Sequence, residues 1–306
     1  MAMKSLPQYF FQLGALSLTM MACWSGFMAL ASDYLNIGPA EASMSEVESM
    51  LLVLAVCVLQ TVLSTALISQ SSWKGFKLII TFFIVMFGIQ FLLTQAENYF
   101  LHGNVTLPDG LIEGILIAGG ALSLIYSIAA VVIMGFHRIK NSERYFRAQR
   151  ERRSYSAKFY FRLLFSAAVI YPAIYFLAGY FILWQFEAAR LYYANSSNKL
   201  PFLEHMQQLF SQSSGSLYFL QVIRGAIWTI IGMLLFNMLK SHVTIKAILI
   251  ALTFSLFMGL QLLIPNPFMP TPVRHAHLLE LLPSNFIWGI VLVWFALRPS
   301  KKKALY

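Results

Sequence analysis

The sequence predicts an all-α bundle of about eight transmembrane helices. Hydrophobic residues make up 58% of its 306 residues and charged residues only 11%, against about 25% charged residues in a typical soluble domain. Several stretches lack any charge over about 18 residues or more, the length that a helix needs to cross a bilayer. They show neither the polar stripe of a soluble helix nor the short alternating segments of a membrane barrel. The charge-free stretches are 5–32, 49–73, 78–96, 115–136, 163–186 and 247–273.

We expect one integral membrane domain over residues 1–306. The first apolar stretch is longer than the core of about 7–15 residues in a signal peptide, which favours an uncleaved first helix. Pro172 should kink the fifth helix, because proline has no backbone N–H, and Pro283 should mark the start of the eighth helix or a kink in it. The expected helices are 8–31, 48–70, 75–98, 112–136, 160–187, 216–239, 244–264 and 281–298.

Charged residues in the connecting segments predict the orientation of the helices. Most of the 22 Lys and Arg residues fall in alternate loops and at both chain ends, and such residues mark the cytoplasmic side. Both termini should therefore face the cytoplasm, with outer loops at 190–215 and 265–280. Of the 12 acidic residues, only Glu143 and Glu151 fall on the inner side. We expect a multi-pass protein of the plasma (inner) membrane with its proton-active groups on the outer side.

The basic connector at 138–159 accounts for much of the net charge of +10. The segment from Arg138 to Arg162 interleaves Arg and Lys with aromatic residues, which fits a helix on the anionic inner leaflet. Each basic residue near such a surface contributes about 1 kcal/mol. Membrane lipids are therefore the expected partner, nucleic acid is not, and a docking site for a cytoplasmic protein is the alternative.

The stretch RHAHLLELL gathers polar groups next to the last apolar segment. The prolines before it, between 265 and 272, disfavour helix and predict a stiff connector. If RHAHLLELL is helical, His277 and Glu280 share one face with Arg274, whereas His275 points elsewhere. One His and one carboxylate are too few ligands for a catalytic metal, which usually has three protein ligands. A hydrogen-bond network that fixes the loop, proton-active or substrate-binding chemistry, and a metal completed by Glu97 or Glu113 all remain open.

Arg224 is the most informative single residue, because it lies within the sixth apolar helix. A charge at that depth costs at least about 2.5–3.5 kcal/mol and is functional by default. It should pair with an acidic residue on the outer side, with Glu97 as the first choice and Glu280 as the second. A purely structural salt bridge is the alternative. The candidate ligand-binding or charge-network residues are Glu97, Glu113, Arg224, His275, His277, Glu280 and Asn285.

The segment FLQVIRGAIW is similar to the Arg-Gly part of the EExxxRG motif of CAAX-type intramembrane proteases. That family also carries later His and Asn motifs, and His277 and Asn285 occur late here. The two glutamates of the motif would fall at Phe219 and Leu220, so the catalytic acid is missing. The chain is therefore not assigned to this family.

No phosphate-binding loop, zinc-protease motif or nucleophile elbow occurs in the sequence. No cofactor and no metal are expected. The leading hypothesis is a transporter or receptor component that binds a small or lipid-like ligand in an outward-facing polar pocket. The alternatives are an intramembrane enzyme that uses His277 and a carboxylate at the outer leaflet, and a structural subunit of a membrane complex.

Overall fold

A computed structural model describes residues 6–35, 45–101, 109–136, 156–266 and 269–298. The described residues form helices and no strand, and eight of the helices are long and apolar enough to cross a membrane. The predicted fold class is thus confirmed. The elements are α1 (Leu6–Leu35), α2 (Glu46–Ser69), α3 (Gly75–Phe87), a π-helix (Gly88–Leu92), α4 (Leu93–Leu101), α5 (Leu111–Ile133), α7 (Ala157–Phe165), a π-helix (Ser166–Ile170), α8 (Tyr171–Phe181), a 3-10 turn (Leu183–Gln185), α9 (Glu187–Ala194), α10 (Phe202–Ser213), α11 (Ser216–Met238), α12 (Val243–Gly259), a 3-10 turn (Leu260–Leu263), α13 (Thr271–Val291) and a final π-helix (Leu292–Leu297).

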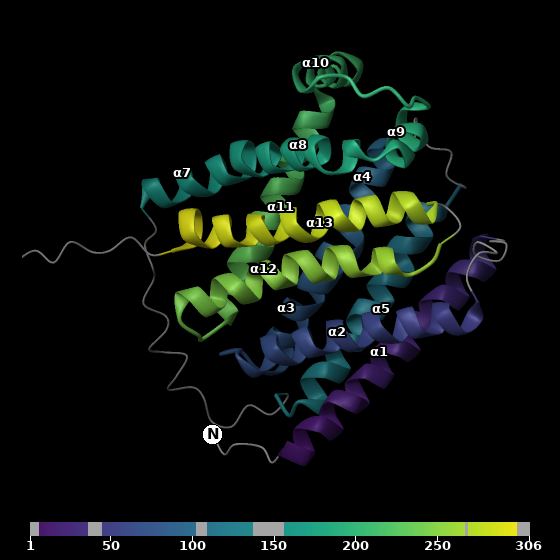
Figure 1. The fold of residues 1–306 in the computed structure, drawn as a ribbon. Coiled ribbons are helices and arrows are strands. Elements are labelled where there is room, and N and C mark those ends of the chain that lie inside the picture. Colours follow the sequence, from purple (N-terminus) through teal and green to yellow (C-terminus); the bar gives the residue numbers. More distant parts are fainter. Residues whose placement is uncertain (1–5, 36–44, 102–108, 137–155, 267–268, 299–306) are drawn as a thin grey trace, which may run out of the picture.

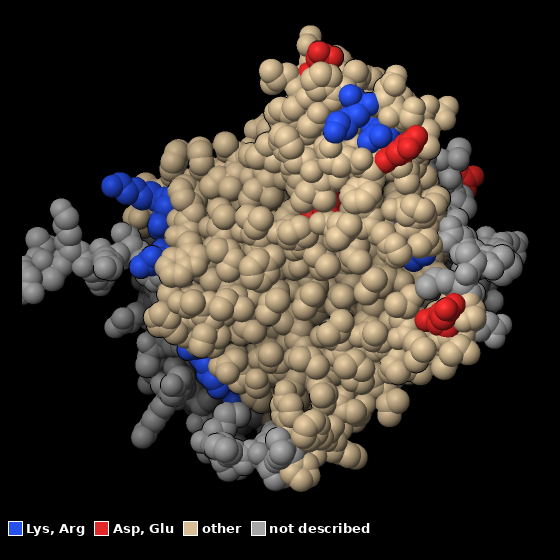
Figure 2. Space-filling model, in the orientation of Figure 1, with Lys and Arg blue, Asp and Glu red and all other residues tan. Residues whose placement is uncertain are grey.

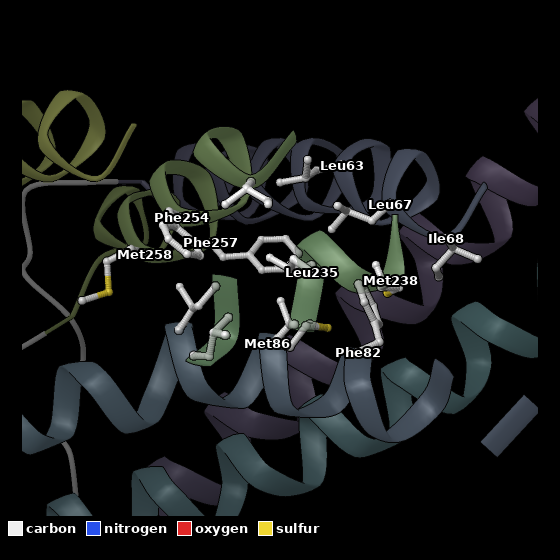
Figure 3. Close-up of a cluster of buried hydrophobic side chains, with 14 of the residues drawn as sticks. Leu63, Leu67, Ile68, Phe82, Met86, Leu235, Met238, Phe254, Phe257 and Met258 are labelled. Carbon is white, nitrogen blue, oxygen red and sulfur yellow. The ribbon is translucent and has the colours of Figure 1, made fainter. Parts of the chain in front are cut away.

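The bundle has two packed groups of helices. In Figure 1, α8, α13 and α12 lie side by side on one side, with α11 behind them, and α1, α2 and α5 form the opposite side. Buried side chains of α2, α3, α11 and α12 join the two groups (Figure 3), among them Leu67, Phe82, Leu235 and Phe254. This shared core fixes how α11 meets its neighbours, and α11 carries Arg224.

Charged side chains lie mainly at the two ends of the bundle. Figure 2 shows a broad apolar flank between them. We call the end where α4 finishes and α13 begins the acidic end, because Glu97, Glu113 and Glu187 lie there, and the other the basic end, because Lys77 and Arg298 lie there. Which end faces the cytoplasm stays a prediction. Residues 1–5, 137–155 and 299–306, which include both chain ends and most of the basic connector, lie outside the described residues.

The prediction that the last helix starts at residue 281 is wrong, because α13 starts at Thr271. Pro272 occupies the first turn of α13, where a missing N–H costs nothing and the fixed φ favours a helix. The region predicted as an outer loop at 265–280 therefore contains ten helical residues of α13. The loop predicted at 190–215 likewise contains most of α9 and all of α10, which lies on the outside of the bundle in Figure 1.

Two prolines interrupt helices without ending them. Pro172 lies two residues after the end of the π-helix Ser166–Ile170, so the ladder of hydrogen bonds changes next to the predicted position. Pro283 lies inside α13. Just after it, the Ser284 hydroxyl donates to the Glu280 carbonyl at 2.6 Å and Asn285 Nδ2 donates to the Leu281 carbonyl at 3.0 Å. Side chains thereby supplement the backbone bonding that proline weakens in a membrane helix.

Glycines let the helices around Arg224 approach closely. A Cβ at Gly225 would collide with the backbone carbonyl oxygen of Ala167, in the π-helix before α8. A Cβ at Gly289 would lie 2.5 Å from the Ala251 Cα, where α13 packs on α12. Small residues allow such backbone contacts in membrane bundles. The α8–α11 and α12–α13 distances therefore depend on these two positions.

We predict that Gly225→Ala lowers the stability of the bundle. The added methyl group has no room against the Ala167 carbonyl, and overpacking of this kind costs about 1–3 kcal/mol. Thermal unfolding in detergent measures the effect. Gly26→Ala is the control, because nothing lies within 4 Å of its Cβ position and its melting temperature should not fall. Equal melting temperatures for the Gly225→Ala variant and the unmodified protein would contradict the close approach.

Candidate functional site

A buried ion pair joins α4 and α11. Arg224 Nη1 lies 2.7 Å from Glu97 Oε2, and the same nitrogen donates to Gln221 Oε1 at 2.9 Å. The Tyr175 hydroxyl of α8 donates to Glu97 Oε1 at 2.6 Å. The Arg224 side chain is only 2% exposed and that of Glu97 22%. The predicted pairing of Arg224 with Glu97 is thus confirmed, and three helices converge on it.

Local backbone geometry brings these groups together. Glu97 follows the π-helix Gly88–Leu92, and Tyr175 follows the π-helix Ser166–Ile170. π-Turns insert an extra residue into a helix, which rotates the side chains beyond it, and they occur frequently at functional sites. Gly225, the residue after Arg224, supplies the close contact with α8 described above. The site therefore depends on irregular turns as well as on side-chain types.

A second hydrogen-bonded chain runs from α9 to α13. The Tyr193 hydroxyl lies 2.7 Å from His277 Nε2, and His277 Nδ1 lies 3.0 Å from Glu280 Oε2. Burial, and then the negative charge of Glu97, raises the pKa of Tyr193 well above the usual tyrosine value. Tyr193 therefore keeps its proton and can donate it to Nε2, which leaves Nδ1 as the donor to Glu280 in the neutral imidazole. The prediction that His277 and Glu280 share a helical face is confirmed.

The short helix α9 is held firmly over the start of α13. Arg190 Nη1 donates to the carbonyl oxygens of Trp184 and Gln185, and its Nε donates to the Ser197 carbonyl. Leu183 and Ala189 pack against Ala276 of α13 in a small apolar cluster. These contacts place Tyr193 against His277 independently of the Arg224 pair.

A cavity of about 20 Å³ lies between the two hydrogen-bonded chains. A volume of this size accommodates about one water molecule or one small polar group. Two buried donors among its lining residues, Arg224 Nε and Trp288 Nε1, have no hydrogen-bond partner among the described residues. An unpartnered buried donor costs about 1–3 kcal/mol, and other buried donors of the described residues, such as Gln60 Nε2 and Gln221 Nε2, lack a partner as well. The cavity is lined by Tyr171, Ile174, Tyr175, Arg224, Met258, Glu280, Leu281, Ser284, Asn285 and Trp288.

The structure brings together some of the predicted site residues and separates others. Arg224, Glu280 and Asn285 line the cavity. Glu97 and His277 are bonded to two of these lining residues, Glu97 to Arg224 and His277 to Glu280. Glu113 is exposed in the first turn of α5, and His275 is exposed on the other face of α13. Neither has a described contact with this group. That these residues form a ligand site stays a prediction.

Arg274 has a different role from that of the cavity residues. It is buried at the start of α13, where its guanidinium donates to the Ile264 carbonyl at 2.8 Å and to the Thr271 hydroxyl at 2.7 Å. It therefore ties the connector after α12 to the first turn of α13. This contact matches the hypothesis of a network that fixes the loop, whereas His277 and Glu280 face the cavity side.

Aromatic residues of the site were not predicted from the sequence. Tyr175 donates to Glu97, and Tyr193 forms a hydrogen bond with His277. Tyr171 accepts a hydrogen bond from Trp228 Nε1 at 3.2 Å. Trp288 stacks at a tilt against Tyr171, with ring centroids 5.4 Å apart. The only signal in the sequence is the Tyr–Pro pair at 171–172, which places a tyrosine at a helix irregularity.

Charge and hydrogen bonding limit what this arrangement can do. Arg224 and Glu97 form one ion pair, and Glu280 contacts His277 instead of a lysine or arginine. No group of three His, Cys, Asp or Glu residues suited to a metal ion occurs in the described ranges. The residues around the cavity thus offer hydrogen-bond donors and acceptors, and Tyr193, His277 and Glu280 form one continuous hydrogen-bonded chain. Comparison with known proteins adds no constraint, since the chain matches no family model, no curated protein and no solved structure.

We predict strong coupling between Arg224 and Glu97. Arg224→Leu leaves the Glu97 carboxylate without its counter-charge, and Glu97→Gln leaves a buried guanidinium unpaired, so each should cost about 3–5 kcal/mol. The double variant removes both charges and should be much more stable than the sum of the two losses implies. A double-mutant cycle on unfolding in detergent measures the coupling. Additive losses would mean that the pair contributes no mutual stabilisation.

Proposed function

We propose that this integral membrane protein binds a small polar or lipid-like molecule in the cavity beside Arg224. It would act as the ligand-binding part of a transporter or receptor, with the acidic end of the bundle on the outer side of the plasma (inner) membrane. The proposal rests on one observation above others, the two buried and unpartnered donors Arg224 Nε and Trp288 Nε1 in the lining. An acceptor atom of a ligand would satisfy both.

The surrounding contacts support this reading. Glu97 and Gln221 bind the guanidinium through Nη1, and Tyr175 in turn donates to Glu97, so Nε is left without a partner among the described residues. Rigid polar groups in a mostly apolar pocket are typical of ligand sites. The basic segment from Arg138 to Arg162 would hold the opposite end against anionic lipid. Its role remains the interpretation made from the sequence.

The test is to identify what the cavity holds. The full chain is purified in mild detergent, extracted and analysed by mass spectrometry, and its structure is determined by cryo-electron microscopy. We expect a co-purifying molecule with density next to Trp288, and a several-fold loss of it in Trp288→Phe, which removes the donor. Trp294→Phe, at a half-exposed position outside the cavity, should retain it. Density for one water molecule and no extracted compound would support a structural subunit instead.

A second candidate function is enzymatic, and the Tyr193–His277–Glu280 chain favours it. A hydroxyl, an imidazole and a carboxylate in series are the arrangement of groups that transfers protons in nucleophilic and general-base catalysis. His277 and Glu280 lie in the half of α13 nearest the acidic end and Tyr193 lies on α9, where an outer-leaflet substrate could reach them. The intramembrane enzyme would then act on a lipid or lipid-linked molecule.

This candidate predicts a chemical change in the host membrane. Cells that overproduce the unmodified protein should accumulate a modified lipid, measured by mass spectrometry of extracted lipids. His277→Gln should abolish it, because glutamine cannot relay a proton in the same way. His275→Gln is the matched control, two residues away on an exposed face, and should leave the product unchanged. Identical lipid profiles with and without the protein would reject the enzyme hypothesis.

A further inference from the structure

A gap between α8 and α13 places one carboxylate oxygen at the apolar flank. A Cβ at Gly179 of α8 would have Glu280 Oε1 as its nearest neighbour, at 4.0 Å, and no other atom within that distance. Gly179 itself is half-buried. Figure 2 shows a small acidic patch within the otherwise apolar flank of the bundle, consistent with an acidic group at such a gap. We call the contact line between α8 and α13 the seam. At Gly179 no side chain of α8 covers Glu280 of α13.

The two oxygens of Glu280 have different surroundings. Oε2 lies 3.0 Å from His277 Nδ1, whereas Oε1 has no hydrogen bond within the described part of the chain. Carboxylates inside a membrane bundle are costly and are normally satisfied. Oε1 is therefore an acceptor on the flank side of the cavity, and Arg224 Nε and Trp288 Nε1 are donors elsewhere in its lining.

The surface around the seam suits an apolar ligand. Leu279 of α13, next to Glu280 in the chain, is 54% exposed. Leu177 and Phe181 of α8, which are 47% and 57% exposed, lie on the face of α8 that points away from Gly179. These side chains would contact lipid tails in a membrane. A molecule that approaches along this flank keeps its apolar body in lipid and need only bring its polar end to the gap.

The donors Arg224 Nε and Trp288 Nε1, the acceptor Glu280 Oε1 and the cavity volume together indicate which polar group a ligand would carry. An ammonium has no acceptor atom for Arg224 and Trp288, and a carboxylate has no hydrogen for Glu280 and would be repelled by it. A hydroxyl both donates and accepts. The cavity volume of about 20 Å³ suits a single terminal group and excludes a phosphate headgroup.

We infer that the cavity takes the hydroxyl end of a long-chain lipid alcohol, which enters sideways from the membrane between α8 and α13 at Gly179. The hydroxyl would donate to Glu280 Oε1 and accept from Arg224 Nε or Trp288 Nε1, while the chain stays on the apolar flank. The inference rests on the proposed ligand-binding function and adds the ligand class and its route of entry.

The test uses a carbodiimide that dissolves in lipid. Dicyclohexylcarbodiimide reacts with a protonated carboxylic acid: the acid proton moves to a carbodiimide nitrogen, the carboxyl oxygen adds to the central carbon, and acyl transfer to nitrogen leaves a stable N-acylurea. The full chain in phosphatidylcholine vesicles is treated at mildly acidic pH, and modification of Glu280 is measured by peptide mass spectrometry. We expect labelling by this reagent to exceed that by a water-soluble carbodiimide several-fold.

Competition identifies the polar end. 1-Dodecanol should slow the labelling of Glu280 several-fold, whereas dodecane and dodecanoate should not. Equal protection by dodecane would show that the hydroxyl is not recognised and would overturn the inference. So would labelling only by the water-soluble reagent, or no labelling by either, because each result means that Glu280 is closed to the lipid phase.

Variants of the gap test the route. Gly179→Val should cover Glu280 Oε1, lower the labelling several-fold and abolish protection by dodecanol. Gly179→Ala has room for its methyl group, so it tests the same point with an intact fold. Gly26→Val, at an exposed position on α1 with open space around it, is the control. Unchanged labelling in both Gly179 variants would exclude entry at this seam.

The outcome separates this inference from the proposed function. If mass spectrometry and density identify another molecule in the cavity while dodecanol gives no protection, the ligand site stands and the lipid-alcohol assignment falls. If dodecanol protects Glu280 equally in Trp288→Phe and in the unmodified protein, the flank binds alcohols without the Trp288 donor. That result would contradict the donor role of Trp288 Nε1 in the proposed site and would leave Arg224 Nε as the donor to the hydroxyl.

Discussion

The guanidinium of Arg224 is the constraint on which the rest of the site depends. It is almost fully buried in the middle part of a helix that otherwise holds no charge. A charge in that environment requires an opposite charge and hydrogen bonds. Glu97 and Gln221 supply them, and Tyr175 donates to Glu97. Because these groups come from α4, α11 and α8, three helices must meet at one depth. The π-turns before Glu97 and Tyr171, and the missing side chain at Gly225, make that meeting sterically possible.

Once Arg224 is paired, the polar groups on α13 have a defined setting. Glu280 is held by His277, and His277 by Tyr193, which α9 fixes from the side. The two chains do not share a hydrogen bond in the described contacts, yet both border the same cavity. The bundle therefore has one ion pair and one hydrogen-bonded chain of Tyr193, His277 and Glu280 beside the same small cavity. A purely structural salt bridge between Arg224 and Glu97 would not require the second hydrogen-bonded chain on α9 and α13.

The fold was predictable from the sequence to a greater extent than the site. Charge-free stretches located six of the eight membrane helices, whereas α11, which contains Arg224, and α13 were predicted from their apolar residues. The scarcity of acidic residues made Glu97 the natural partner of Arg224. The start of α13 at Thr271 was missed because proline both begins and breaks helices, and only the tertiary context distinguishes Pro272 from its neighbours. Tyr175, Tyr193 and Trp288 were missed because aromatic residues make up 15% of this chain, and most of them serve packing or lipid contact. Gly179 carries no signal in sequence, since its effect is the absence of an atom in front of Glu280.

The imbalance between charge and hydrogen bonding is the strongest argument for a ligand. In the described site the charges of Arg224 and Glu97 cancel, so this pair requires no further counter-ion. The hydrogen bonds do not cancel, because Arg224 Nε and Trp288 Nε1 have no acceptor and Glu280 Oε1 has no donor. In a soluble protein, bulk water can form hydrogen bonds with such groups at little cost, but the hydrocarbon interior of a membrane contains no water to do so. Groups of these complementary kinds around one small cavity suit a guest that both donates and accepts, and a water molecule and a hydroxyl are the smallest guests that do so.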